Sequence, residues 1–308
     1  MVVVAGELRS LGQLERTARA FQQDAWEAMR GDIVRALVEY ITNADDAYAR
    51  KGGKGRILVE VEHRRGDEPW TARVSDRATG MSLREMNEKI GRQGGRTSGF
   101  DQGAAVRGNL GVGSKDPACF GQVVFESLKN NEYGVYEIDD QGDRLSSVKP
   151  LRVTQDIRQR LGIPANGTVV TIQVSHPVSC PRHDNLKFLL SNNVLLRDIM
   201  RDLQREVFLA HANKPEARPD RLRFEPPALT TRVSRRHVPL PGYPGAFADI
   251  EIGEAEEPFS DEGRRSPTRK SGLLIKGRRA IYECSLFSFE NNANALAFSG
   301  SIRCEDID

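Results

Sequence analysis

Three polar side chains share one face of a helix that the sequence predicts from Asp32 to about Arg50. Glu39, Asn43 and Asp46 are four and three residues apart, which is the spacing of neighbours on a helix surface. Their face borders the apolar stripe of the same helix. Two carboxylates and an amide beside a core are costly unless they are hydrogen-bonded or bind something. The pattern therefore indicates a ligand site, although a solvated helix edge has the same composition.

A further carboxylate stands at the end of a predicted strand. Asp76 closes this strand, and Gly80 lies in the turn that follows it. A carboxylate in this place can accept a hydrogen bond from an amino group of a ligand. It can equally form an Asx-turn or cap the helix expected next. Gly167 and Thr168 begin another predicted strand, for which an ordinary turn before a strand is the alternative.

Residues 91–114 are rich in glycine and show little periodicity, which predicts a long loop. Long loops inside compact domains are usually functional. The segment 108–115 ends this loop just before a predicted helix. Its glycines allow backbone N–H groups to surround an anion, to which Lys115 could add a cation. The spacing differs from that of a Walker A loop because Lys115 follows Ser114, and flexible loops share the composition.

In this order, the four segments resemble the motifs of the GHKL ATPases. This superfamily includes gyrase-type topoisomerases, heat-shock chaperones, histidine kinases, MutL-type repair proteins and microrchidia ATPases. The resemblance covers roughly residues 10–175. The matching segments are 39–47 for Glu-x-x-x-Asn-Ala-x-Asp-Ala, 76–81 for Asp-x-Gly-x-Gly-Met, 108–113 for the glycine box of the ATP lid, and Gly167-Thr168 for the last motif.

The resemblance implies ATP and Mg²⁺ as ligands and gives individual residues their roles. It implies that Glu39 is the general base for the attacking water, that Asn43 ligates Mg²⁺, and that Asp76 accepts the adenine amino hydrogen. Lys115 is not a general family feature, and we add it as a phosphate contact from its position. Ala78 replaces a usual glycine, so we expect an altered turn beneath adenine. The other implied nucleotide contacts are Asp46, Gly80, Met81, Gly108, Gly111, Val112, Gly113 and Thr168.

The length of 308 residues exceeds what one core usually organises and predicts two domains. By resemblance, residues 1–176 form an ATP-binding domain with the Bergerat fold, a two-layer sandwich of helices on a mixed β-sheet. Residues 177–308 then form a smaller, transducer-like α/β domain that a longer chain could continue. A basic residue of this domain reaches the γ-phosphate in hydrolase members. Of Arg269, Lys270 and Lys276 we choose Lys270, in a polar loop, with a solvated charge run as the alternative.

Hydrophobic periodicity predicts the elements that must position these residues. Period-four patterns predict helices, period-two patterns predict strands, and the segment after Pro177 is predicted to be rich in helix. The expected helices are 11–30, 32–50, 83–90 and those within 177–212; the expected strands are 56–63, 70–76, 122–129, 133–139, 167–175, 273–275 and 280–283; residues 254–271 are expected to be an exposed loop.

Composition excludes several classes of protein. Lys+Arg is 45 and Asp+Glu is 43, and this net charge of +2 gives no argument for a nucleic-acid or membrane partner. No stretch approaches the roughly 18 apolar residues of a membrane-spanning helix, and the start of the chain does not resemble a signal peptide. The four cysteines are far apart, which favours reduced, buried thiols. We therefore expect a cytoplasmic protein, or a nuclear one in a eukaryote.

The resemblance implies an ATP-driven switch, in which nucleotide binding closes the lid and clamps two chains into a homodimer. Histidine kinases generally lack the carboxylate at Glu39, so its presence favours a hydrolase of the chaperone-like or DNA-associated kind. A nucleotide-sensing interaction module with little hydrolysis is the first alternative. A DNA-binding clamp of the microrchidia or MutL type is the second, and a salt-bridged surface would explain its basic residues equally well. These residues are Arg197, Arg201, Arg205, Arg232, Arg235 and Arg236.

Overall fold

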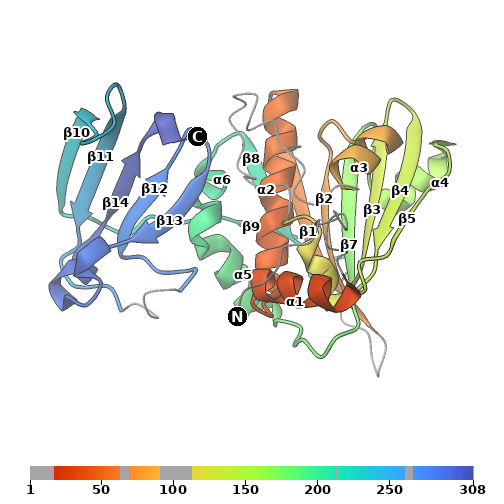
Figure 1. Ribbon diagram of the computed structural model, residues 1–308, viewed down its shortest axis with the longest axis horizontal. Coiled ribbons are helices and arrows are strands. Elements are labelled where there is room, and N and C mark those ends of the chain that lie inside the picture. The colour runs from red at the N-terminus through yellow and green to blue at the C-terminus, as the bar shows by residue number, and fades with distance from the viewer. Residues whose placement is uncertain are drawn as a thin grey trace, which may run out of the picture.

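The computed structural model describes residues 17–62, 69–90, 113–211, 214, 216–260 and 266–307. These residues form a mixed α/β structure with two separate β-sheets. Figure 1 shows the two sheets at opposite ends of the molecule, with helices between them. None of the helices in this part of the chain combines the length and apolar character that crossing a membrane requires.

Two helices open the described chain. Helix α1 (Ala18–Met29) begins at Thr17, whose hydroxyl accepts a hydrogen bond from a backbone N–H of the first turn. Helix α2 (Ile33–Lys51) begins at Asp32, whose carboxylate accepts the Val34 N–H at 2.9 Å. The long second helix, predicted from Asp32 to about Arg50, is therefore confirmed. The expected start of the first helix at residue 11 lies outside the described residues.

The larger sheet has nine strands and is mixed. Strands β1 and β8 pair in parallel, whereas the other pairs of this sheet are antiparallel. This arrangement confirms the strands predicted between residues 56 and 175. The spatial order is β5 (Arg144–Ser146), β4 (Glu132–Ile138), β3 (Gly121–Lys129), β7 (Gly167–Val174), β2 (Trp70–Asp76), β1 (Gly55–Glu62), β8 (Arg205–Leu209) and β9 (Asp220–Leu222), with β6 (Leu151–Arg152) on β4.

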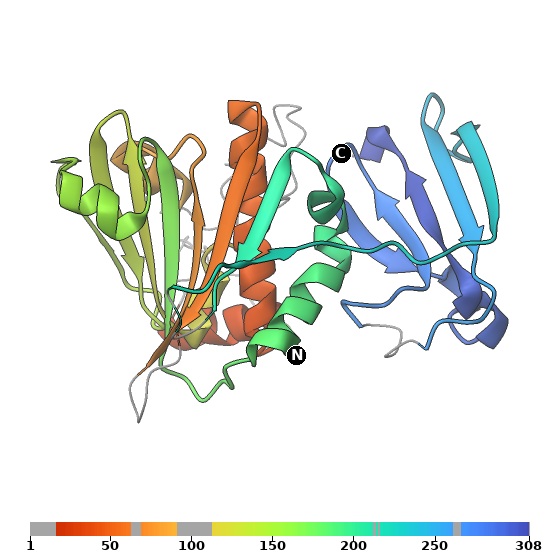
Figure 2. The ribbon, with the colours of Figure 1, turned by 180° about the vertical axis from the view of Figure 1, so that it is seen from behind.

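Helices cover the two faces of this sheet unequally. Helices α1, α2 and α3 (Leu83–Lys89) contribute to the main core on one face, as do α5 (His183–Asn192) and α6 (Arg197–Arg201). Helix α4 (Gln155–Leu161) packs on the other face with a smaller cluster (Figure 2). The neighbours Val169 and Val170 belong to different clusters, because successive strand residues point to opposite faces.

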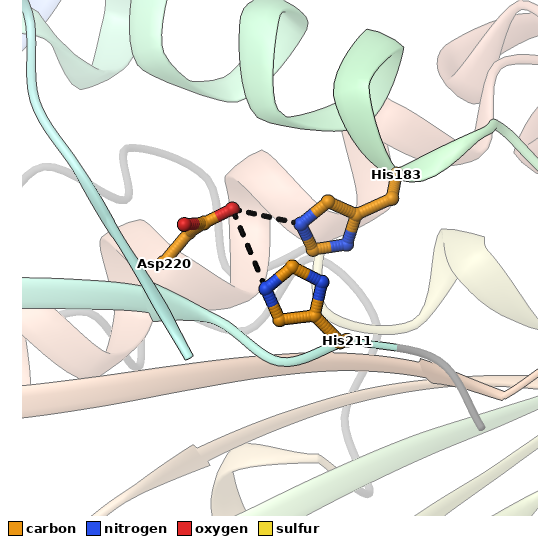
Figure 3. A group of neighbouring side chains, drawn as sticks. All are labelled: His183, His211 and Asp220. Carbon is orange, nitrogen blue, oxygen red and sulfur yellow. Dashed lines mark hydrogen bonds and ion pairs between the residues drawn. The ribbon is translucent and has the colours of Figure 1, made fainter. Parts of the chain in front are cut away.

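The chain after residue 177 returns to the larger sheet. The prediction of helix up to residue 212 is wrong at its end, because Arg205–Leu209 is strand β8. The predicted boundary at residue 177 precedes two strands of the nine-stranded sheet, β8 and β9. These strands lie beside α5, where His183, His211 and Asp220 come together (Figure 3).

The second sheet has five strands, again with one parallel pair, β12 with β14. Its antiparallel pair β12–β13 confirms the strand pair predicted from the sequence. A small apolar cluster of Val194, Leu274 and Ile281 packs a 3₁₀ helix, η3 (Val194–Leu196), against this sheet. The spatial order is β10 (Thr231–Pro239), β11 (Phe247–Glu254), β14 (Phe298–Arg303), β12 (Gly272–Lys276) and β13 (Ile281–Ser285).

Candidate functional site

A cavity of about 350 Å³ opens between α2, α3 and the ends of β2, β3 and β7. Its volume lies within the range of small-molecule sites, roughly 300–1,000 Å³. Segments more than a hundred residues apart in the sequence meet in its wall. Seven residues selected from the sequence line this cavity: Glu39, Asn43, Asp46, Asp76, Gly80, Met81 and Thr168.

The α2 side of the cavity carries an acid–amide pair. The Asn43 side-chain amide donates to Glu39 Oε1 at 3.4 Å, one helical turn away. Burial raises the pKa of Glu39, and the nearby charges of Asp116 and Asp46 act in the same direction. A carboxylate with a raised pKa is a better proton acceptor than an ordinary one, as a general base requires.

Gly113 packs closely against the acid of this pair. A Cβ atom at Gly113 would lie only 2.5 Å from the Glu39 carboxyl carbon, so a side chain there would displace the carboxylate. The neighbouring Ser114 carbonyl accepts a hydrogen bond from the Tyr40 hydroxyl at 3.1 Å. Gly113 is thus the end of the predicted glycine box that touches the acid. Gly108, Gly111 and Val112 lie outside the described residues.

Asp76 is buried at the end of β2 and faces the cavity. Its carboxylate accepts the Ala78 N–H at 2.8 Å, so the Asx-turn that the sequence allowed is present. Burial raises the pKa of Asp76 to about 6, against the lowering effect of hydrogen bonds from the Ala78 and Thr168 backbone. Ala78 is fully buried and has no positive φ, so this turn accepts an alanine.

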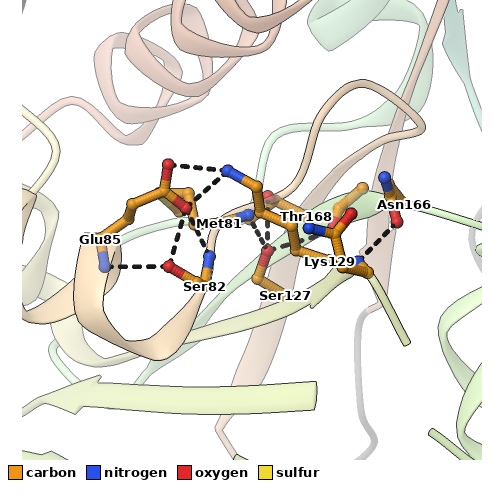
Figure 4. Close-up of polar contacts among 9 residues, drawn as sticks. Met81, Ser82, Glu85, Ser127, Lys129, Asn166 and Thr168 are labelled. Atoms are coloured by element: carbon orange, nitrogen blue, oxygen red, sulfur yellow. Dashed lines mark hydrogen bonds and ion pairs between the residues drawn. The ribbon is translucent and has the colours of Figure 1, made fainter. Parts of the chain in front are cut away.

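A hydroxyl network fixes the turn after Asp76 (Figure 4). Ser127 Oγ accepts the Met81 N–H at 2.7 Å and lies 3.1 Å from Thr168 Oγ1. It also lies 3.1 Å from the Gly167 carbonyl. The network joins the turn to β3 and β7. Sequence reasoning missed Ser127, because a single buried serine in a strand carries no motif.

An ion pair forms another part of the wall. Lys129 Nζ lies 2.7 Å from both carboxylate oxygens of Glu85. Glu85 also accepts the Ser82 N–H and thereby completes a capping box at the start of α3. Burial works against ionisation of Glu85, but these hydrogen bonds lower its pKa to about 2. The Ser-x-x-Glu spacing was the signal that could have found this group.

Lys115 and Lys270 do not line the cavity. Lys115 is buried just before the five-residue 3₁₀ helix η2 (Asp116–Phe120), and burial lowers its pKa to about 8. Lys270 is exposed. Its neighbour Arg269 is buried, which corrects the expectation of a fully exposed loop, and it contacts Glu290 at 3.1 Å.

The basic patch expected from the sequence is smaller than predicted. Arg197 and Arg205 are buried, so neither belongs to a surface that nucleic acid could reach. Lys276, the third candidate for a phosphate contact, lies 2.7 Å from Asp198. The other four residues of the predicted patch stay exposed: Arg201, Arg232, Arg235 and Arg236.

Sequence reasoning also missed a buried charge network behind the cavity. Asp45 is 1% exposed and accepts a hydrogen bond from Arg205 Nε of β8 at 2.7 Å. It also accepts one from Arg279, in the turn between β12 and β13. Arg279 Nε lies 3.8 Å from Asp46, which lines the cavity. The helix that carries the candidate acid is thus linked to the second sheet.

A search of protein-family models finds no match to this chain, and a search of curated protein sequences finds none either. The candidate site therefore rests on its own geometry and on the motif resemblance.

Gly80 offers a stability test of this geometry. It has φ +64°, and a Cβ there would lie 2.0 Å from the Leu128 carbonyl oxygen. Gly162 has φ +67° but open space around it. Gly162→Ala should therefore lower the free energy of unfolding only by the strain of alanine in the left-handed conformation, about 1–2 kcal/mol. Gly80→Ala should lower it by an additional amount of about 1–3 kcal/mol, because its Cβ also overpacks the turn. Urea unfolding of both variants measures the difference, and equal losses would contradict the tight packing of this turn.

Proposed function

We propose that the cavity binds Mg²⁺·ATP and that the chain hydrolyses it in the manner of the GHKL ATPases, with a Bergerat-type arrangement of helices on the mixed sheet. The observation that carries the proposal is the convergence of Glu39, Asn43, Asp76 and Thr168 on one cavity. These residues come from α2, β2 and β7, in the order of the motifs that they resemble.

The chemistry of the donor atoms fits this ligand. A carboxylate only accepts hydrogen bonds, so the contact with Glu39 requires Asn43 to turn its NH₂ group toward the acid. Its carbonyl oxygen is then a hard ligand of the type that Mg²⁺ prefers. Bound Mg²⁺ would supply neutralisation of phosphate charge. Asp76 offers an acceptor for an adenine amino group, and Met81 adds an apolar side chain to the same wall.

Hydrolysis needs a nucleophile held in position and a group that removes its proton. Glu39 stands at the α2 side of the cavity, beside Gly113. Its raised pKa suits the acceptance of a proton from water. Most of the remaining catalysis in phosphoryl transfer comes from positioning and charge neutralisation. The cavity wall provides cationic side chains for this purpose at Arg50 and Lys89.

Calorimetric titration with a non-hydrolysable ATP analogue and Mg²⁺ tests the proposal. The expected result is saturable binding near one per chain. In Asp76→Asn, the amide presents an NH₂ group or a neutral oxygen to the adenine amino group, and affinity should fall about tenfold, the value of one lost charge-assisted hydrogen bond. A folded chain that binds no nucleotide would overturn the proposal, and an unchanged affinity in Asp76→Asn would overturn the adenine contact.

The pH dependence separates this contact from a general disturbance of the pocket. The pKa of Asp76 is raised to about 6, so the ionised acceptor is lost as the pH falls through that value. Affinity of the unaltered chain should then fall below pH 6 by about tenfold in all, because that is the value of the charge-assisted hydrogen bond that protonation removes. The ratio of its affinity to that of Asp76→Asn cancels protonation of the ATP phosphates. This ratio should decrease between pH 7 and 5, and a constant ratio would contradict the role of Asp76.

One observation favours the alternative of a nucleotide-sensing module with little hydrolysis. Lys270 does not line the cavity, and Arg269 and Lys276 are engaged with Glu290 and Asp198. Turnover in this conformation would therefore lack the cation that hydrolase members take from the second domain. We infer that hydrolysis depends on a rearrangement of the second sheet. The same proposal includes ATP-dependent pairing of two chains and a protein or DNA client. Phosphate release under saturating ATP distinguishes the two functions.

A further inference from the structure

A cluster of three side chains at the edge of the nine-stranded sheet lies apart from the cavity and plays no part in the proposed function. His183 is the first residue of α5, His211 follows β8 by two residues, and Asp220 is the first residue of β9. Backbone pairing holds the last two in place. Leu209 lies opposite Asp220 in the β8–β9 ladder, and the Ala210 N–H donates to the Val59 carbonyl at 2.8 Å.

Both imidazole rings direct their Nε2 atoms at one carboxylate oxygen (Figure 3). His183 Nε2 lies 2.9 Å from Asp220 Oδ2, and His211 Nε2 lies 3.7 Å from the same atom. One donor atom from each of the three residues lies within 4.8 Å of the others. The rings stack with centroids 4.1 Å apart and an interplanar angle of 17°. Three ligand atoms from separate elements thus converge on one point.

We propose that His183, His211 and Asp220 bind a divalent transition metal ion, with Zn²⁺ as the representative ion. Zn–N and Zn–O bonds of about 2.0–2.2 Å in a tetrahedron place neighbouring ligand atoms about 3.3 Å apart. The two observed distances to Asp220 lie on either side of that value, at 2.9 and 3.7 Å. Rotation of the two imidazole rings out of their stacked arrangement, so that both Nε2 lone pairs face one ion, would complete the site.

The surroundings suit an ion with an open coordination position. The three side chains are between 22 and 31% exposed, so water can complete the coordination shell. Lys187 Nζ lies 3.2 Å from Asp220 Oδ2 and is itself 44% exposed. This ammonium group occupies the place of a cation at the carboxylate and competes with the metal. The bound ion would cross-link α5, β8 and β9, and so hold the edge of the sheet.

Titration of Zn²⁺ into the metal-stripped full chain tests the site. Binding of one ion per chain is expected, with affinity reduced tenfold or more in His183→Ala and in His211→Ala. His176→Ala is the matched control, because His176 pairs with Asp140 at 3.0 Å but belongs to no described three-residue cluster. Cys180→Ser controls for binding through the half-buried thiol three residues before His183 in the sequence. Loss of the ion in either control, or its retention in both alanine variants, would overturn the proposal.

Lys187→Met gives a test that keeps all three ligands and does not depend on the folding of the histidine variants. Removal of the competing ammonium group should tighten Zn²⁺ binding by tenfold or more. It should also increase the rise in Tm that Zn²⁺ produces, since a ligand of the folded state stabilises it by mass action. If the histidines only hydrogen-bond Asp220, the affinity of this variant will be unchanged or weaker, and the metal site is refuted.

Discussion

Glu39→Gln should reduce ATP turnover by about 10²- to 10⁴-fold, the usual contribution of a general base, while nucleotide affinity stays within a few-fold of the original. Glutamine has the shape of glutamate and can still accept the Asn43 amide hydrogen, so the wall of the cavity keeps its form. It cannot take a proton from water. Phosphate release at saturating ATP measures the loss, and calorimetry with a non-hydrolysable analogue measures the affinity.

Glu137→Gln is the matched control for this substitution. Glu137 is also a half-buried glutamate that accepts a hydrogen bond from a side-chain amide, from Gln122 at 2.9 Å, but it does not line the cavity. Its replacement should leave turnover unchanged. Full hydrolysis by Glu39→Gln would refute the assignment of the base. If the unaltered chain binds ATP without turnover, the nucleotide-sensing function is the better conclusion.

The parts of the candidate site that could be predicted are those that depend on local spacing. Glu39, Asn43 and Asp46 share a helix face because residues three and four apart are neighbours on any α-helix. Asp76 and Thr168 come together by a different route. Their strands β2 and β7 are adjacent in the sheet, with Ser75 opposite Val169. Periodicity does not reveal such long-range pairing, so the order of the motifs carried this part of the prediction.

The features that sequence reasoning missed depend on contacts between distant segments. Strand β8 pairs in parallel with β1, about 150 residues earlier in the chain, so no hairpin signal marks it. Adjacent residues present a similar difficulty. Arg269 is buried and Lys270 is exposed, and only the path of the backbone decides which of two neighbouring basic residues points inward. Asp45 likewise has no local feature that predicts its contacts with Arg205 and Arg279.

Asp45→Ala should lower the free energy of unfolding by about 3–5 kcal/mol, the usual cost of removing one partner of a buried ion pair. The Asp45 and Arg205 side chains are only 1 and 5% exposed. The substitution leaves Arg205 with hydrogen bonds to the carbonyls of Gly53 and Gln204. Urea unfolding at neutral pH measures the effect. It should persist at high salt, because buried charges are screened much less than exposed ones.

Three further substitutions show whether burial is the cause. Glu88→Ala breaks an exposed pair with Arg84 on α3 and should cost about 0.3–0.5 kcal/mol. Arg279→Leu should cost less than Arg205→Leu, because the Arg279 side chain is 26% exposed and Asp45 keeps its contact with Arg205. If Asp45→Ala costs no more than Glu88→Ala, Asp45 is not the buried link between α2 and the second sheet. If the predicted order holds, the buried contact with Arg205 contributes more to stability than the partly exposed contact with Arg279, and Asp45 joins the helix that carries Glu39 to both sheets.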